Sequence, residues 1–160
     1  MSGVKRRQVT NLWRISPFAD LTGKGGYFAS GRWHSQGKPV VYLSGTASGA
    51  MLETLVHLGQ GDDGELPDQY QLLQVGFDGD VSVVEVNPDD LAEDWEERLA
   101  YTQELGDEWL ESGESLLLKV PSKIMPHSDN YVMNPSHQES QKATIEVATH
   151  SYDKRLFRRG

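Results

Sequence analysis

"GRWHSQGKPVVYLSGTASGAMLETLVHLG" (residues 31–59) is the most informative stretch for the architecture, because a strand pattern and a helix pattern follow one another within it. The part "PVVYLS" (39–44) is rich in β-branched and aromatic residues, as strands are. In "SGAMLETLVHLG" (48–59) the apolar residues form one broad helical stripe, and a glycine ends the segment. A glycine and a proline precede the strand, so residues 31–44 are expected to fold as a β-hairpin.

Beyond this stretch, segments with a strand pattern outnumber those with a helix pattern. The strand segments are 9–16, 70–77, 81–86, 115–122, 130–135 and 143–157, the last of them as one strand or two. An acidic helix is expected at 96–113 and a glycine-rich loop at 18–31. The strands at 70–77 and 81–86 flank "DGD" and are expected to form a hairpin. Because strands and helices do not alternate regularly, the sequence predicts an α+β fold, with a mixed or antiparallel sheet flanked by a few helices.

The composition is that of an ordinary water-soluble protein. The 160 residues are 37% hydrophobic and 24% charged, and one domain spanning residues 1–160 is expected to bury a core. No apolar run approaches the roughly 18 residues that cross a bilayer, and the basic N-terminal segment lacks the apolar stretch of a secretory signal. The chain has no cysteine, which excludes disulfides and thiol catalysis. A cytoplasmic protein that binds no membrane is therefore expected.

The charges are unevenly distributed along the chain. The net charge of −9 disfavours direct nucleic-acid binding, because phosphate contacts need a positive surface. Residues 62–114 hold 18 of the 24 acidic residues and only one basic residue, Arg98. The rest of the chain holds 14 of the 15 basic residues, which predicts a basic region suited to an anionic ligand. The acidic segment is either a solvated surface or a surface that docks a partner protein.

Two arginines flank the glycine-rich loop. Arg14 lies near the end of the first predicted strand, and Arg32 directly follows the loop. A guanidinium is a planar fork of donors that matches phosphate oxygens, so the two side chains are candidates to clamp a pyrophosphate. Alternatively, each forms an ion pair on the surface. The "GKGG" inside the loop is not a P-loop, because it lacks the terminal Gly-Lys-Ser/Thr and opens no predicted helix.

Glu53 and His57 lie four residues apart in the predicted helix 48–59, so their side chains share one face. Either they form an exposed pair or they point into a cleft. In a cleft, a partly buried carboxylate can stabilise a developing positive charge or take a proton. Glu53 is therefore a candidate catalytic residue.

The remaining candidates carry weaker signals. Trp33 is expected in the core, whereas Tyr42 faces away from its apolar neighbours, where its ring can stack on a planar ligand. Ser122 follows an apolar strand outside any G-x-S-x-G elbow, so a ligand contact or a turn is expected rather than a nucleophile. Asn130 follows soon after. The five histidines lack metal-ligand spacing, so no metal site is expected.

The order of these motifs identifies a family. "LWRIS", "GGYFASGRWHSQGKPVVYLS", "AMLETLVHLG", "GDEWLESGESLLLKVPS" and "DNYVMNP" follow one another in the chain. In this order the chain, from about residue 12 to residue 158, resembles the RES domain family, which supplies the toxins of a group of bacterial type II toxin–antitoxin systems. It departs from the family at "HSQ" (34–36), where an asparagine-containing turn is commoner. These residues are expected at the tip of the hairpin.

The family is named for an arginine, a glutamate and a serine, which match Arg32, Glu53 and Ser122 here. Further polar positions of the family's pocket match Arg14, Tyr42 and, as an additional candidate, Asn130. The resemblance implies an ADP-ribosyltransferase-like fold and NAD as the substrate, without a metal. It also implies a cognate antitoxin, a helical DNA-binding protein that blocks the active site.

From this resemblance we expect an enzyme that breaks the nicotinamide–ribose bond of NAD. The two arginines are expected to hold the pyrophosphate, and Tyr42 to stack on or orient the nicotinamide. Glu53 is expected to stabilise the cationic sugar, as in glycoside cleavage, or to act as a base on the acceptor. Ser122 is expected to fix the ribose or the nicotinamide by hydrogen bonding, and His57 to orient Glu53.

Three functions stay open from the sequence. The first is transfer of ADP-ribose to a protein target. The second is transfer to water or phosphate, which depletes NAD. The third is a non-catalytic module that binds a nucleotide or a partner protein, against which the joint presence of Arg32, Tyr42, Glu53 and Ser122 argues.

Overall fold

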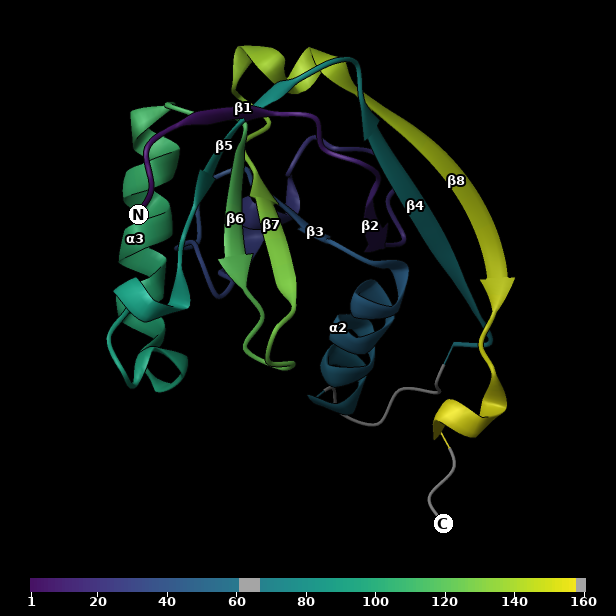
Figure 1. Ribbon diagram of the computed structural model, residues 1–160. Coiled ribbons are helices and arrows are strands. Elements are labelled where there is room, and N and C mark those ends of the chain that lie inside the picture. The colour runs from purple at the N-terminus through teal and green to yellow at the C-terminus, as the bar shows by residue number, and fades with distance from the viewer. Residues whose placement is uncertain (61–66, 158–160) are drawn as a thin grey trace.

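A computed structural model describes residues 1–60 and 67–157 of the chain (Figure 1). Residues 62–66 of the acidic segment, and residue 158 at the end of the family resemblance, lie outside the described residues. The described elements are β1 (Lys5–Arg7), β2 (Leu12–Ile15), α1 (Gly25–Phe28), β3 (Val41–Ser44), α2 (Ala47–Gln60), β4 (Gln69–Phe77), β5 (Val81–Glu85), η1 (Pro88–Asp90), η2 (Trp95–Glu97), α3 (Leu99–Ser112), β6 (Leu117–Pro121), β7 (Asp129–Met133), η3 (Gln138–Lys142), β8 (Ala143–Ser151) and η4 (Lys154–Phe157).

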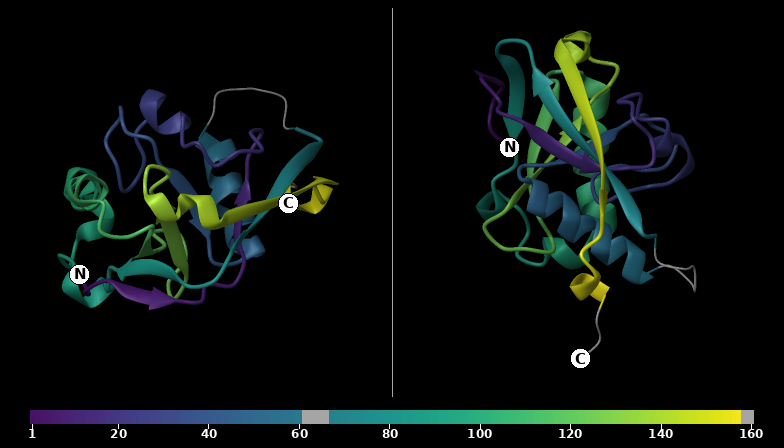
Figure 2. Two further views of the ribbon diagram at one scale, coloured as in Figure 1. Left: turned by 90° about the horizontal axis from the view of Figure 1, so that it is seen from above. Right: turned by 90° about the vertical axis from the view of Figure 1, so that its right-hand side faces the viewer.

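Eight strands of the described chain form one mixed sheet. Its order is β1-β5-β6-β7-β3-β2-β4-β8, and every neighbouring pair is antiparallel except β5 and β6. The sheet is curled, with α3 and the β4–β8 pair at opposite sides of the molecule and α2 between them (Figure 1, Figure 2). The predicted α+β fold, with a mixed sheet and few helices, is confirmed.

The two faces of the sheet carry separate apolar cores. Adjacent residues of one strand divide between these cores, as Leu117 and Leu118 do in β6, because side chains alternate along a strand. The second core is shared with α3 and contains Trp33, Trp95 and Trp109. Trp33 is 2% exposed, so its prediction as a core residue is confirmed.

The predicted hairpin of residues 70–77 and 81–86 is wrong, although both strands exist. β4 pairs with β2 and β8, whereas β5 pairs with β1 and β6. The chain turns a corner at residues 78–80, where Gly79 has a φ of 76°. The backbone N–H of Asp78 donates to the carbonyl oxygen of Lys142, 2.9 Å away, so the end of β4 stays paired with the start of β8. β5 then begins in another part of the sheet.

Residues 31–44 do not form a hairpin either. β3 is an inner strand that pairs with β7 on one side and β2 on the other, so neither edge is free to pair with the residues before it. Those residues form a loop with one isolated bridge between Gly31 and His34. His34 is 2% exposed and is therefore not at an exposed tip.

Two short elements, β1 and α1, are not predicted by the sequence. β1 has only three residues and is recognisable by its pairing with β5. α1 is a single turn inside the glycine-rich loop, so "GKGG" does open a helix, although one of only four residues. Gly26 is needed there, because a Cβ atom would overlap the carbonyl oxygen of Lys38. Within the described part of the chain, no helix is long and apolar enough to span a bilayer.

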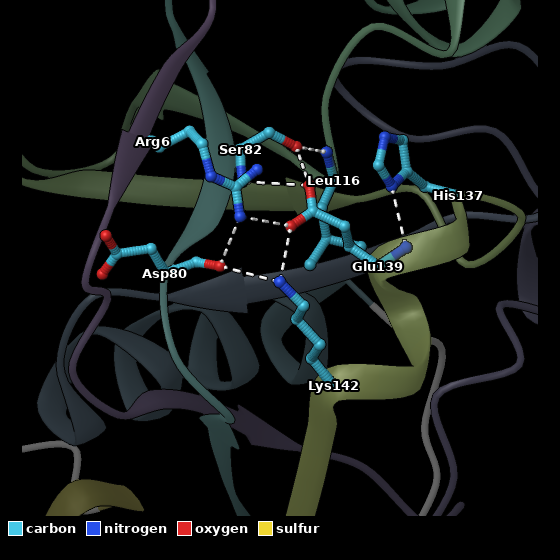
Figure 3. Close-up of polar contacts among 7 residues, drawn as sticks. All are labelled: Arg6, Asp80, Ser82, Leu116, His137, Glu139 and Lys142. Carbon is cyan, nitrogen blue, oxygen red and sulfur yellow. Dashed lines mark hydrogen bonds and ion pairs between the residues drawn. The ribbon is translucent and has the colours of Figure 1, made fainter.

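Glu139 connects the two ends of the sheet (Figure 3). It lies in η3, which leads into β8, and its carboxylate accepts hydrogen bonds from Ser82 of β5, Arg6 of β1 and Lys142. Burial raises the pKa of this carboxyl, but the hydrogen bonds from Ser82, Lys142 and Arg6 outweigh burial and lower the pKa to about 2. The charged carboxylate therefore stabilises the folded protein.

We expect Glu139→Gln to destabilise the protein at neutral pH and to weaken its acid sensitivity. The folded pKa of about 2 lies below the ordinary value of 4.5 for a glutamate carboxyl group. The stabilisation is therefore complete above pH 4.5 and is lost as pH falls towards 2. Its size is about 3 kcal/mol. Urea unfolding at a series of pH values measures it, and equal acid dependence in the variant and the parent would contradict the assignment.

Candidate active site

One pocket of about 630 Å³ brings together most of the predicted site residues. Its walls come from β2, β3, β7, α2, the start of α3, the residues around α1 and the loop after β6. Six of the seven predicted site residues line it: Arg14, Arg32, Tyr42, Glu53, His57 and Asn130. The seventh, Ser122, is not among the lining residues, but its hydroxyl donates a hydrogen bond to Glu53, which is. The guanidinium-bearing Arg32 and the carboxylate-bearing Glu53 therefore share one cavity.

α2 carries Glu53 into the pocket, together with Ala50 and Thr54 on the same helical face. Its Oε1 accepts a hydrogen bond from Asn130 Nδ2 at 2.9 Å and one from Ser122 Oγ at 3.4 Å. Oε2 has no hydrogen-bond partner among the described residues and is not sealed from solvent. One oxygen is thus fixed by the protein, and the other is available to a ligand.

Ser122 is itself fixed by its surroundings. It directly follows Pro121, the last residue of β6, and is 9% exposed. Its Oγ accepts hydrogen bonds from the backbone N–H groups of Ile124 and Met125, both at 3.2 Å, and donates its proton to Glu53. The Ser122 hydroxyl is therefore committed to supporting the carboxylate.

His57 lines the pocket one turn after Glu53 but is exposed. In the chain as described it makes no hydrogen bond to Glu53. The contacts that orient the carboxylate come instead from Asn130 and Ser122, on β7 and after β6. These residues are far from α2 in the sequence, so helical spacing pointed to the wrong neighbour.

Arg14 is half-buried in β2 and lines the pocket. Its guanidinium forms no hydrogen bond or ion pair with another described residue. Burial lowers the pKa of this guanidinium, and the negative charge of Asp20 acts in the opposite direction. A half-buried cation without a direct protein partner, facing a cavity, is chemically suited to an anionic ligand.

Arg32 enters the pocket from the loop before β3. Its Nη1 donates to the carbonyl oxygen of Glu96 in η2, at 3.1 Å, and the other nitrogens have no partner in the described residues. The alternative of surface ion pairs, open from the sequence, is not realised within this part of the chain for Arg32 or for Arg14. Two guanidinium groups thus retain free donors around one cavity.

The Tyr42 side chain lies on the side of β3 that lines the pocket. Its hydroxyl is hydrogen-bonded to a buried histidine, His34. His34 Nε2 lies 3.0 Å from the carbonyl oxygen of Ala29, which can only accept, so Nε2 carries the proton. His34 Nδ1 must then accept the Tyr42 proton, at 2.7 Å. The backbone N–H of Trp33 donates to the same hydroxyl at 3.0 Å. Burial raises the pKa of Tyr42, which keeps it a phenol.

His34 is the site residue that sequence reasoning missed. The only signal for it was its place in "GRWHS", next to Arg32 and Trp33, and the hairpin prediction assigned it to an exposed tip. Its buried position follows from the loop around it, because the N–H of Gly31 donates to the carbonyl oxygen of His34 at 3.1 Å. The ring itself is held by its two hydrogen bonds, to the Tyr42 hydroxyl and to the Ala29 carbonyl oxygen.

We expect His34→Asn to reduce the loss of stability on mild acidification. Burial lowers the pKa of His34, while the Ala29 carbonyl and the Asp107 charge oppose this and Lys38 adds to it. The folded state therefore binds fewer protons than the unfolded state, whose pKa is about 6.5. Stability is full above that pH and is lost as pH falls through the lowered pKa. Thermal unfolding at pH 7.5 and pH 5 should differ less for the asparagine variant; an equal difference would contradict this.

No group of three or more His, Asp or Glu side chains within the described residues is arranged to bind a metal ion. The polar lining of the pocket includes two guanidinium groups, the Lys123 ammonium group, one fixed carboxylate and an asparagine amide. The guanidinium groups are donors for phosphate oxygens, and the carboxylate is suited to a centre that becomes positively charged. The pocket can therefore bind a phosphate-bearing ligand and stabilise a cation within it.

Comparison with known proteins gives a consistent relationship. The model of the RES domain family matches residues 11–155 of the chain. A Pseudomonas putida protein named Toxin Res is 44% identical over 146 residues, which cover 91% of this chain and 99% of that protein. The Prs ADP-ribosylating toxin of a Sphingobium species is 33% identical over 161 residues, covering 94% of this chain and 98% of that protein.

A solved structure has the same fold. A chain in the crystal structure of the M. tuberculosis MbcT-MbcA toxin–antitoxin complex superposes with a TM-score of 0.72 and covers 97% of this chain and 90% of its own length. The sequence identity is 16%, so this likeness concerns the fold alone. The sheet and its flanking helices are thus an arrangement that another chain also adopts.

Proposed function

This chain belongs to the RES domain family of toxins, and from that premise we propose that it cleaves the nicotinamide–ribose bond of NAD and transfers ADP-ribose to a protein target in the cytoplasm. The observation that carries the proposal is the convergence of Arg14, Arg32 and Glu53 on one pocket. The name of the Sphingobium relative, an ADP-ribosylating toxin, supports the choice of reaction.

The pocket suits a dinucleotide in size and in chemistry. Its volume of about 630 Å³ lies within the usual range for small-molecule sites. Arg14 and Arg32 offer free guanidinium donors, which match the oxygens of a pyrophosphate. Partly exposed apolar residues such as Ile15 and Val56 also line the pocket and suit the flat faces of the bases.

Glu53 supplies the electrostatic part of the reaction. When the bond between the ribose and the nicotinamide nitrogen breaks, its electron pair leaves with the nicotinamide and the ribose becomes an oxocarbenium-like cation. Nicotinamide departs as a neutral molecule, so no general acid is required. Asn130 and Ser122 already fix one carboxylate oxygen, so the negative charge needs little reorganisation to stabilise the cation. The acceptor then attacks the ribose and gives up its proton, for which Glu53 is the nearby base.

Tyr42 contributes its ring rather than its hydroxyl. The hydroxyl donates its only proton to His34 and accepts from the Trp33 backbone, so it has no proton left for a ligand. The ring lines the pocket and can stack on a planar group such as nicotinamide. Ser122 and Asn130 act through Glu53.

The proposal extends to a protein partner that covers the pocket and silences the toxin. The Res-named relatives are toxins, and the structural relative was solved as a toxin–antitoxin complex. An inhibitory partner of this kind would have to block the cavity shared by Arg32 and Glu53. Co-expression with the neighbouring gene product should restore growth and stop nicotinamide release; release that continues in the purified complex would reject pocket occlusion.

Labelled NAD tests the reaction and separates its acceptors. With [32P]NAD and cell lysate, we expect nicotinamide release and a labelled protein band. Free ADP-ribose without a labelled band would replace the protein acceptor by water, and ADP-ribose 1″-phosphate would replace it by phosphate. The Glu53→Gln protein is the control for non-enzymatic labelling. If the parent releases no nicotinamide under any of these conditions, the proposed reaction is wrong.

A further inference from the structure

The acidic helix α3 has no role in the proposed chemistry, yet one stripe of it contacts the loop that carries Arg32. We propose that α3 positions Arg32 in the pocket through this stripe, which consists of Thr102, Gln103, Gly106 and Asp107. The proposal rests on the proposed function, in which Arg32 binds the pyrophosphate of NAD. It gives this part of the acidic segment 62–114 a structural role that the sequence did not predict.

Two side chains of the stripe bind the backbone on both sides of the Arg32 Cα atom. Thr102 Oγ1 donates to the carbonyl oxygen of Arg32 at 2.6 Å, and Thr102 is 0% exposed. Gln103 Nε2 donates to the carbonyl oxygen of Gly31 at 3.0 Å. The two peptide groups that flank Arg32 are therefore both held by α3.

The next turn of α3 holds the following loop residues. Asp107 accepts hydrogen bonds from the backbone N–H of Ser35 at 2.9 Å and from its hydroxyl at 2.6 Å. Gly106 lies so close to the carbonyl group of Trp33 that a Cβ atom there would overlap it. Residues 102, 103, 106 and 107 have the spacing of one helical face, so a single rigid helix contacts four loop residues.

Backbone pairing in the sheet does not provide this support, although the Tyr42 hydroxyl of β3 accepts from the Trp33 N–H at 3.0 Å and donates to His34. β3 pairs with β2 and β7, so residues 31–38 have no strand beside them, and their one bridge joins Gly31 to His34 within the same loop. The guanidinium of Arg32 also depends on this part of the chain, because its hydrogen bond goes to Glu96 in η2, just before α3. Residues 96–107 thus hold both carbonyl groups that flank the Arg32 Cα atom and also its guanidinium, while β3 adds the Tyr42 contact to Trp33.

Thr102→Val is the sharpest test, because it keeps the shape of the side chain and removes one hydroxyl. We expect the KM for NAD to rise roughly three- to tenfold, as for the loss of one buried hydrogen bond, with kcat within about twofold of the parent. The amides of residues 31–35 should exchange faster with deuterium. Thr102→Ser, which restores the hydroxyl, should recover both values.

Two controls separate positioning from general loosening. Glu108→Gln removes a charge from the exposed side of α3 and should leave KM and exchange unchanged. In an Arg32→Ala background, Thr102→Val should cause no further rise in KM, because it acts through Arg32. An additional rise of the same size would mean that Thr102 supports the fold in general, and would overturn the proposal.

The remaining outcomes are also decisive. Unchanged KM and unchanged exchange in Thr102→Val, or a fall in kcat alone, would overturn the positioning role. A parent protein that releases no nicotinamide would instead reject the proposed function. In that case the exchange of residues 31–35 still tests whether α3 holds the loop, since this measurement needs no NAD.

Discussion

Replacing Glu53 by glutamine is expected to lower kcat for nicotinamide release by roughly 100- to 1,000-fold, while NAD binding changes by only a few-fold. Losses of this size are typical when a group that stabilises charge in the transition state is removed. Glutamine keeps the length and shape of the side chain and can still accept the hydrogen bonds from Asn130 and Ser122 through its amide oxygen. The substitution removes the negative charge and replaces the free acceptor oxygen Oε2 by an amide donor.

The split between kcat and binding follows from where that charge acts. In the ground state the positive charge of NAD lies on the nicotinamide ring and the ribose is neutral, so Glu53 attracts the ground state less strongly than the transition state. In the transition state the ribose is cationic, and the carboxylate then attracts it. The matched control is Glu146→Gln in β8, an exposed position that does not line the pocket, which should behave like the parent.

Single-turnover nicotinamide release measures the chemical step, and titration calorimetry measures NAD affinity. Cells that express the variant should also grow normally. A Glu53→Gln protein that consumes NAD at the parent's rate would eliminate the carboxylate from the mechanism. A variant that no longer binds NAD would show instead that Glu53 acts in the ground state.

Every described strand except β1 could be predicted from the sequence, but the pairing of the strands could not. Alternation along one strand is a local signal, and it located the buried residues on either side of Tyr42. The partner of a strand is decided by contacts distant in sequence. The turn "DGD" has the composition of a hairpin, yet Asp78 bonds to Lys142, 64 residues later by number, and β4 and β5 are not neighbours.

The same reasoning explains which site residues were found. Arg32, Glu53 and Ser122 were located because their motifs match a family, and the structure groups them without reference to it. His34 and Thr102 carry no motif, and their roles depend on contacts across the fold. Thr102 lies 70 positions from Arg32, so nothing near either residue predicts their hydrogen bond. His57 was chosen by helical spacing, whereas contacts from other elements orient Glu53.

Arg14→Met should weaken NAD binding at least tenfold and yet leave the folded protein as stable as the parent, or more stable. In the free protein the Arg14 guanidinium is half-buried without a hydrogen bond or ion pair to the described residues, and burial lowers its pKa. A buried charge of this kind lowers the free energy of unfolding. An apolar residue of similar length removes this desolvation cost. Attraction to Asp20 offsets part of it.

The binding loss has a separate origin. A charge-assisted hydrogen bond to phosphate contributes roughly 1.5–3 kcal/mol, which corresponds to a factor of about 10 to 150 in affinity. The affinity is best measured in the Glu53→Gln background, where turnover does not consume the ligand. The unfolding temperature of the ligand-free protein should fall by no more than about 2 °C.

Arg6→Met is the matched control, because it removes another arginine from the same sheet and is expected to have the opposite effects on stability and NAD affinity. Arg6 bonds to the buried Glu139 and lies outside the pocket, so its loss should lower the unfolding temperature and leave NAD affinity unchanged. Opposite signatures for the two arginines would mean that one is kept for the ligand and the other for the fold. If Arg14→Met instead unfolds several degrees earlier and binds NAD normally, Arg14 is a structural residue, and the pyrophosphate must be held by Arg32 alone.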